Sequence, residues 1–188
     1  MDKKKIGLII GSLREKSYSR KIAQLLVTLS PATLQLEIIE IGGLGLYNAD
    51  LENNLPAEWQ SFRDRIKSCT GIIFVTPEYN RSIPGLLKNA IDIASRPITE
   101  NAWNGKPAAI ISISQGAMGG FGANHHLRQC LVFLDVPAML QPEAYIGKVN
   151  MLFDENGDFN NEDTRKFLNS FMKAFEIWIS RFVNPYKQ

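Results

Sequence analysis

The sequence predicts an α/β protein, a three-layer sandwich in which helices cover both faces of a five-stranded parallel sheet. Short apolar runs alternate with amphipathic helical patterns five times along the chain, and this alternation is typical of βα units in a parallel sheet. Most of the runs are almost continuously apolar, as expected for strands buried on both faces. The length of 188 residues suits one hydrophobic core, so we expect residues 1–188 to form one domain.

Each predicted strand is a short apolar run, and each of the first four is followed by a polar or glycine-containing turn. The five runs occupy residues 5–10, 34–41, 71–76, 107–114 and 136–140. Runs of this length bounded by turn residues fit buried strands better than helices. Consecutive parallel strands need crossover connections, and the segments between the runs are long enough to supply helices.

Each predicted helix places apolar residues on one face. The helical segments are 17–29, one that begins at Pro56, 84–95, 123–134 and 163–182. The last segment carries an aromatic stripe with steps of four, four, three and four residues, formed by Phe167, Phe171, Phe175, Trp178 and Phe182. Spacing of this kind indicates packing against the core and not a cofactor-binding cluster.

Composition excludes several functional classes. The net charge of +2 arises from 21 basic and 19 acidic residues, which is too weak a balance to indicate nucleic-acid binding. The first apolar run, 6–10, is too short for a signal peptide or a membrane span. Two isolated cysteines, Cys69 and Cys130, predict no disulfide framework, metal site or iron–sulfur cluster. We therefore expect a cytoplasmic protein without a metal and without a membrane partner.

The loop after the first strand, GSLREKSYSR, predicts an anion site. It carries Ser12, Arg14, Ser17 and Ser19 and leads directly into a helix. Hydroxyl groups and backbone N–H groups at a helix N-terminus suit a phosphate, and an arginine adds charge and directional donors. The alternative is that a serine only caps the helix while Arg14 is solvated.

The loop after the third strand, TPEYNRSIPG, contains more chemistry than a connector needs. Pro77 fixes the backbone, Tyr79 offers an aromatic face with a hydroxyl, and Asn80 offers an amide. A planar apolar ligand needs a rigid wall with hydrogen-bonding groups around its rim. The alternative is an asparagine-containing turn with exposed side chains.

The loop after the fourth strand, SQGAMGGFG, has four glycines in nine residues, which would allow the backbone to approach a ligand closely. Alone, it fits a flexible loop equally well. The three loops follow strands one, three and four, and these strands are neighbours if the sheet order is 2-1-3-4-5. The topological switch point then lies between strands one and three, where such sheets bind ligands.

The three loops resemble the NAD(P)H-dependent FMN reductases, a group that includes quinone, azo-dye and chromate reductases. The resemblance rests on GSLREKSYSR, TPEYNRSIPGLLKNAIDIASRP and SQGAMGG in this order and spacing, and it covers roughly residues 4–139. It implies a flavodoxin-like fold with noncovalently bound FMN. Many members have asparagine where this chain has Ser19, a change that keeps a hydroxyl and a capping group.

The resemblance also implies which residues contact FMN. The phosphate would contact Ser12, Arg14, Ser17 and Ser19, and the ribityl chain would contact Tyr18. The isoalloxazine ring would contact Pro77, Glu78, Tyr79 and Asn80 along one edge. Its other edge would contact Ser114, Gln115 and Gly116. For Glu78 we expect the backbone to matter, with the side chain in solvent or against a partner subunit.

The expected activity is electron transfer from NADPH or NADH to a small-molecule acceptor, with ping-pong turnover in which hydride passes to flavin N5 and then to the acceptor. No side-chain acid or base is needed for hydride transfer, so we assign no catalytic residue, and we expect His125 and His126 to cap a helix or contact a subunit. Arg81 and Arg96 are candidates for binding an anionic substrate. The alternative is that each is an ordinary solvated arginine on the surface. Family members are usually homodimers or homotetramers.

Two other classes of flavoprotein fit the same loops. A flavodoxin-type electron carrier binds FMN without reacting with nicotinamide, but such carriers are typically strongly acidic. A redox-sensing module would use the flavin structurally, and the exposed character of the loop around Tyr79 argues against it.

Overall fold

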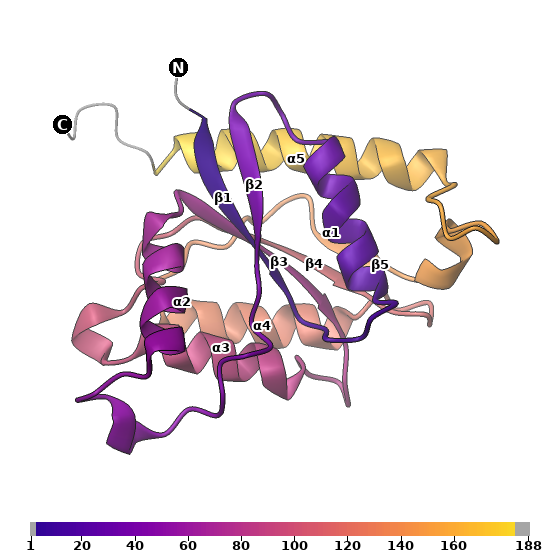
Figure 1. Cartoon of the computed structure of the whole chain (residues 1–188). Coiled ribbons are helices and arrows are strands. Elements are labelled where there is room, and N and C mark those ends of the chain that lie inside the picture. Colours follow the sequence, from indigo (N-terminus) through magenta and orange to yellow (C-terminus); the bar gives the residue numbers. More distant parts are fainter. Residues whose placement is uncertain (1–2, 183–188) are drawn as a thin grey trace.

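The computed structural model describes residues 3–182 and contains a central sheet between two layers of helices (Figure 1). The sheet order is β2-β1-β3-β4-β5 and all four pairings are parallel, which confirms the predicted fold class and order. The strands are β1 (Lys4–Ile10), β2 (Leu34–Ile39), β3 (Gly71–Pro77), β4 (Ala108–Ile113) and β5 (Ala144–Ile146).

Five helices and three short 3₁₀ segments connect and follow these strands within residues 3–182. The helices are α1 (Tyr18–Thr28), α2 (Ala57–Ser68), α3 (Gly85–Ser95), α4 (Phe121–Phe133) and α5 (Glu162–Ser180), and the 3₁₀ segments are η1 (Ala49–Leu51), η2 (Ile98–Glu100) and η3 (Val149–Leu152). No helix in this part of the chain combines the length and apolar composition needed to cross a membrane.

The core consists of two hydrophobic clusters, one on each face of the sheet. Successive strand residues point to opposite faces, so Leu8 packs toward α1 and α5 while Ile9 packs toward α2, α3 and α4. The predicted aromatic stripe of α5 contributes Phe171 and Phe175 to the first of these faces. Phe182 lies beyond the end of α5 and is exposed.

The predicted fifth strand at 136–140 is wrong. In that segment only Ala138 forms a bridge, to Ala108, and the regular pairing with β4 occurs later, at β5. Pro137 and Pro142 flank the bridged stretch, and proline cannot donate a ladder hydrogen bond. Along the chain, this edge of the sheet therefore begins with the single bridge at Ala138, is interrupted at Pro142, and continues with the three paired residues of β5.

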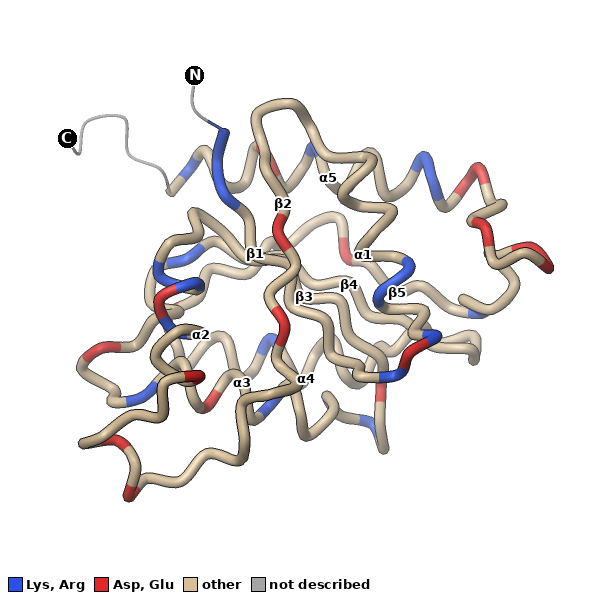
Figure 2. The backbone as a smooth tube through the Cα atoms, in the orientation of Figure 1, with Lys and Arg blue, Asp and Glu red and all other residues tan. Residues whose placement is uncertain are grey.

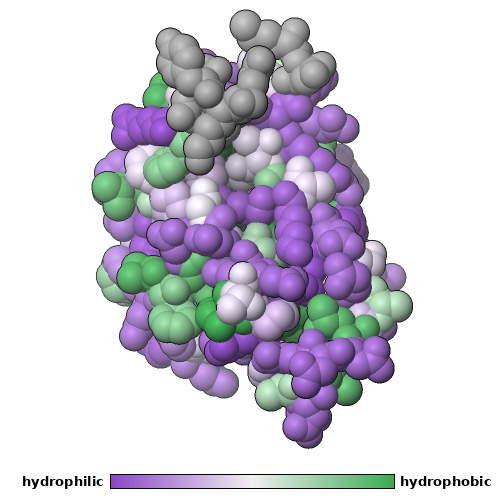
Figure 3. Space-filling model, turned by 90° about the vertical axis from the view of Figure 1, so that its left-hand side faces the viewer, coloured by the Kyte–Doolittle hydropathy of each residue, from purple (hydrophilic) through white to green (hydrophobic). Residues whose placement is uncertain are grey.

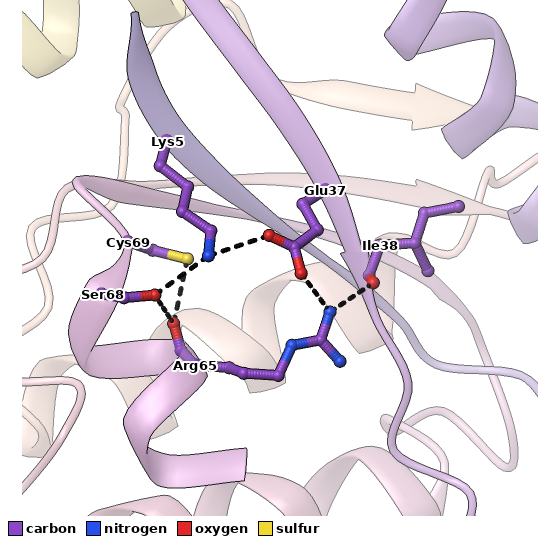
Figure 4. Close-up of polar contacts among 6 residues, drawn as sticks. All are labelled: Lys5, Glu37, Ile38, Arg65, Ser68 and Cys69. Atoms are coloured by element: carbon purple, nitrogen blue, oxygen red, sulfur yellow. Dashed lines mark hydrogen bonds and ion pairs between the residues drawn. The ribbon is translucent and has the colours of Figure 1, made fainter. Parts of the chain in front are cut away.

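The opposite edge strand, β2, is held to its neighbours by charged side chains (Figure 4). The Glu37 carboxylate contacts Lys5 Nζ of β1 at 2.9 Å and also the guanidinium of Arg65 on α2. Hydrogen bonds from these two cations lower the pKa of Glu37. Charges on an edge strand also oppose pairing with other chains.

The two ends of the sheet differ in what they present. Figure 3 views the end where the strands begin, and its visible surface is mostly hydrophilic with hydrophobic residues in separate small areas. At the other end, the loops that follow β1, β3 and β4 meet beside the start of α1 (Figure 1). In an open parallel sheet this second end, at the switch point, is where a ligand site is expected.

Candidate functional site

The loop after β1 places buried hydroxyl groups at the N-terminus of α1. Ser17 is the N-cap, and its side chain accepts a hydrogen bond from Arg20 N at 3.3 Å. Ser12 Oγ accepts one from Arg14 N at 3.3 Å. Ser12, Ser17 and Ser19 are all at most 5% exposed. The capping alternative therefore holds for Ser17, and the same geometry leaves N–H groups of the first turn facing the loop.

Basic and acidic residues alternate along the loop that leads from β1 into α1 (Figure 2). Arg20 forms a two-pronged ion pair with Glu40, with both N–O distances 2.8 Å. This pairing raises the pKa of Arg20 and lowers the pKa of Glu40. Within residues 3–182, the guanidinium of Arg14 makes no ion pair and no hydrogen bond, and only its backbone N–H is bound, by Ser12 Oγ. Arg14 is therefore the arginine of this loop whose charge is available to an anion.

The loop after β3 begins with a tight two-residue turn. Tyr79 N donates to Ser82 O at 2.9 Å, and Ser82 N donates to Tyr79 O at 3.0 Å. The two central residues, Asn80 and Arg81, have φ values of 52° and 65°, as a type I′ turn requires. Pro84 then leads into α3. This turn fixes the position of Tyr79, which remains 47% exposed.

The side chain of Glu78 is not in solvent, so the first of the two placements expected from the sequence is wrong. It is 13% exposed, and its Oε2 accepts a hydrogen bond from Ala123 N at 3.1 Å at the start of α4. A carboxylate is stabilised at a helix N-terminus because the N–H groups there lack helical partners. A Cβ at Gly122 would lie 3.0 Å from Glu78 Oε2, so glycine allows α4 to approach this loop.

The loop after β4 uses its glycines to pack against the chain around β5. A Cβ at Gly119 would lie 2.5 Å from the carbonyl carbon of Tyr145, and Gly119 has a φ of +60°. Gly147 is equally restricted, because its Cβ would lie 2.5 Å from Ala117 O. Ser114 N donates to Ile146 O at 3.0 Å. The loop is thus held against backbone, with Ser114 and Gln115 left facing the other two loops.

The three loops enclose a cavity of about 150 Å³. Ten of the predicted FMN contacts line it, namely Ser12, Arg14, Ser17, Tyr18, Ser19, Pro77, Glu78, Tyr79, Ser114 and Gln115. Drug-sized ligands occupy pockets of about 300–1,000 Å³, so this cavity would enclose one part of a nucleotide and leave the rest exposed.

Two cavity-lining residues were missed from the sequence, and two predicted contacts lie outside the lining. Ile113 and Val149 line the cavity, and as apolar residues in apolar segments they carry no sequence signal of a site. Asn80 is exposed at the tip of its turn, and Gly116 is exposed in the third loop. Neither lines the cavity within one chain.

The two substrate-binding candidates lie far apart. Arg81 is adjacent to the cavity residue Tyr79, and its side chain is 78% exposed. Arg96 is the C-cap of α3, and the eleven residues of that helix extend about 16 Å. It lines a different cavity, together with Cys130 and Phe133 between α3 and α4. Within one chain, Arg96 is therefore at the end of α3 that is distant from the site.

The two histidines both contact neighbouring elements. His126 Nδ1 hydrogen-bonds Ser82 Oγ at 2.5 Å, which ties α4 to the turn after β3. His125 Nε2 hydrogen-bonds the Tyr145 hydroxyl at 2.9 Å and packs against Phe121, with ring centroids 4.3 Å apart. Burial raises the pKa of Tyr145 to about 12, so this phenol stays protonated at neutral pH.

The fold defines a flavodoxin-like α/β protein, and its cavity lies at the switch point between β1 and β3, where such sheets bind ligands. The chain belongs to the NADPH-dependent FMN reductase family, which matches residues 4–150. It is 53% identical over 175 residues to a quinone reductase from Pseudomonas putida, covering 93% of this chain and 94% of that protein.

Two further proteins support the family. A 2-hydroxy-1,4-benzoquinone reductase from Burkholderia sp is 43% identical over 175 residues, covering 93% of this chain and 96% of that protein. The flavoenzyme FerB from Paracoccus denitrificans, an NAD(P)H:(acceptor) oxidoreductase, superposes with a TM-score of 0.89 at 38% identity, covering 95% of this chain and 98% of FerB. The chain is accordingly an oxidoreductase that uses FMN and NAD(P)H.

The residues around the cavity are chemically suited to FMN. Buried hydroxyls, a helix N-terminus and Arg14, whose guanidinium has no ion pair in the part of the chain that is described, match a phosphate. The carboxylate that lines the cavity, Glu78, is already bound by Ala123 N and Arg81, so it does not present an uncompensated charge to the ligand.

Proposed function

We propose that this protein is an FMN-dependent NAD(P)H:quinone reductase. The observation that carries the proposal is that ten residues chosen from three separate loops line one cavity. Similarity to quinone reductases along 93% of the chain supports the choice of acceptor. Quinones are also planar, so they suit an open site beside an aromatic side chain.

In this proposal the phosphate end of FMN is held at the start of α1. Ser12, Ser17 and Ser19 supply hydroxyl groups, and Arg14 supplies the compensating charge. Tyr18 lies along the ribityl chain. Its ring is fixed from behind by Phe153, with centroids 5.6 Å apart.

The ring system of FMN lies between the loops after β3 and β4. Pro77, Glu78 and Tyr79 would form one edge, and Ser114 and Gln115 would form the other. Asn80 and Gly116, which do not line the cavity, would contact the part of the ring outside it. The turn at Tyr79–Ser82 and the packing of the third loop on β5 keep both edges rigid. A rigid edge with one open face allows donor and acceptor to use the same position.

FMN supplies the redox chemistry when bound, and the protein supplies position and electrostatics. Because both substrates would use one open face, we propose ping-pong kinetics in which NAD(P)+ leaves before the acceptor binds. Azo compounds, free flavins and chromate-type oxyanions are further acceptors that such an open site would accept.

We also propose a homodimer or homotetramer in the cytoplasm. Val132 and Phe133, near the end of α4, are 80% and 73% exposed, and large apolar side chains at this exposure favour a protein contact. An interface there would include Arg96 and its cavity between α3 and α4. In that arrangement Arg96 could contact the substrate site of a partner subunit, which it cannot do at the site of its own chain.

Anaerobic reduction tests the proposed function directly. The purified protein is expected to contain flavin with absorbance near that of FMN, and one equivalent of NADPH or NADH should bleach it rapidly. Steady-state rates with 1,4-benzoquinone, an azo dye and chromate then rank the acceptors. A yellow protein that stays oxidised with both nucleotides would contradict the enzyme and favour an electron carrier or a sensor.

A further inference from the structure

The turn after β3 carries an arginine where its backbone favours glycine. The second central position of a type I′ turn requires a positive φ, and glycine is strongly preferred there. Arg81 occupies this position with a φ of 65°. A backbone conformation that is unfavourable for the residue it carries is a reason to look for a function of its side chain.

The Arg81 guanidinium is available to a ligand. It is 78% exposed, and its one ion pair within residues 3–182 joins Nη1 to Glu78 Oε1 at 3.5 Å. An exposed ion pair of this kind contributes little to stability. Glu78 would still accept the hydrogen bond from Ala123 N after Arg81 left. Arg81 can therefore move to another anion while the Glu78 carboxylate keeps its hydrogen bond at the start of α4.

His126 adds a second polar side chain at the same turn. It hydrogen-bonds Ser82, the residue after Arg81, through Nδ1. The side chain is exposed, and no hydrogen bond in the described part of the chain engages its Nε2. The bond to Ser82 fixes the ring, so Nε2 is a positioned donor or acceptor and not a freely rotating one.

We infer that Arg81 and His126 form an anion-binding subsite at the rim of the cavity, for the charged group of the second substrate. The ligand chemistry is a phosphate of the dinucleotide or an ionised hydroxyl of a quinone, both of which match a guanidinium fork. The neighbouring Tyr79 lines the cavity, so a ligand held at this turn reaches the proposed flavin position. This inference rests on the proposed function.

Substitution of Arg81 by glycine tests the subsite without a folding penalty. Arg81→Gly removes the guanidinium and relaxes the positive φ, so thermal stability should stay equal or rise. NADP+ is titrated calorimetrically into the oxidised, FMN-loaded protein, which gives a dissociation constant independent of turnover. Loss of a charge-assisted contact should weaken binding about tenfold. The affinity of Arg81→Lys for NADP+ should lie between that of the wild type and that of Arg81→Gly.

The two sources of the anion are separated by a second probe. 2-Hydroxy-1,4-naphthoquinone, which is ionised at neutral pH, is titrated in the same way, and neutral 1,4-naphthoquinone serves as its control. A loss confined to NADP+ assigns the subsite to the donor phosphate, and a loss confined to the hydroxyquinone assigns it to the acceptor. The affinity for neutral naphthoquinone should not change.

Two other variants complete the test. His126→Gln should weaken, at least threefold, the binding of the anion whose affinity Arg81→Gly lowers. An unchanged affinity would show that His126 is not part of the subsite. Lys166→Met removes an exposed charge from α5, on the opposite face of the sheet, and should have no effect. If Arg81→Gly binds both anions as tightly as the wild type, the subsite is refuted. A wild type that is not bleached by NADPH would instead refute the proposed function.

Discussion

Arg14→Ala should weaken FMN binding about tenfold and leave the stability of the protein unchanged. Arg14 is exposed and makes no ion pair in the described part of the chain, so its removal breaks no internal contact. A charge-assisted hydrogen bond contributes about 1.5–3 kcal/mol. We expect the lower end, about 1.5 kcal/mol, because Arg14 remains open to solvent and its charge is screened.

Fluorescence titration of FMN into the apoprotein measures this change. The matched control is Lys16→Met, which removes a neighbouring exposed cation that does not line the cavity. Raising the ionic strength should weaken the wild type more than Arg14→Ala, because the variant has already lost the phosphate contact. Equal affinities for Arg14→Ala and the wild type, or an equal loss in Lys16→Met, would refute the assigned phosphate site.

Three further predictions concern the second loop, the third loop and the edge strand. Asn80→Ala should alter the flavin spectrum or its rate of reduction with the fold intact. Asn80→Gly also removes the amide but suits the positive φ of the turn, so it distinguishes loss of the amide from a change in the turn. An unchanged spectrum and rate would argue against ring contact. Gly119→Ala should lower the free energy of unfolding in urea by about 2–4 kcal/mol, because the new Cβ meets the Tyr145 backbone at 2.5 Å. Gly43→Ala, with no atom within 4 Å of its Cβ, should cost less than about 1 kcal/mol. The pKa of Glu37 is lowered in the folded state, so its contribution to stability is present above the ordinary glutamate pKa of about 4.3 and is lost as pH falls below it. Glu37→Gln should flatten the decline in stability below pH 4.3; an unchanged slope would contradict this role.

The sheet could be predicted well where strands are buried on both faces. The apolar runs at 5–10, 71–76 and 107–114 match β1, β3 and β4 to within one residue at either end. The fifth strand failed because 136–140 is as apolar as a strand and does touch β4 at Ala108. Pairing at this edge depends on how the segment lies against β4 and on the interruption at Pro142. Apolar composition carries neither kind of information, so it selected the wrong part of the segment.

The site could be predicted where it depends on polar chemistry in loops. Arg14 and Tyr79 stand out because they lie in loops that follow the carboxyl ends of neighbouring parallel strands, where such sheets bind ligands. Val149 could not be found, because it reaches the cavity through the packing of the third loop on the chain after β5. The role of Glu78 also escaped prediction, since its partner Ala123 lies 45 residues further along the chain.

A crystal structure of the FMN-loaded protein would show whether the cavity between the three loops binds FMN. We expect the FMN phosphate within hydrogen-bonding distance of Arg14 and of the hydroxyl groups of Ser12 and Ser17. The ring should lie between the loops after β3 and β4, next to Tyr79. FMN bound elsewhere, for example in the groove between Leu140 and Trp178, would refute the assignment of the cavity as the FMN site.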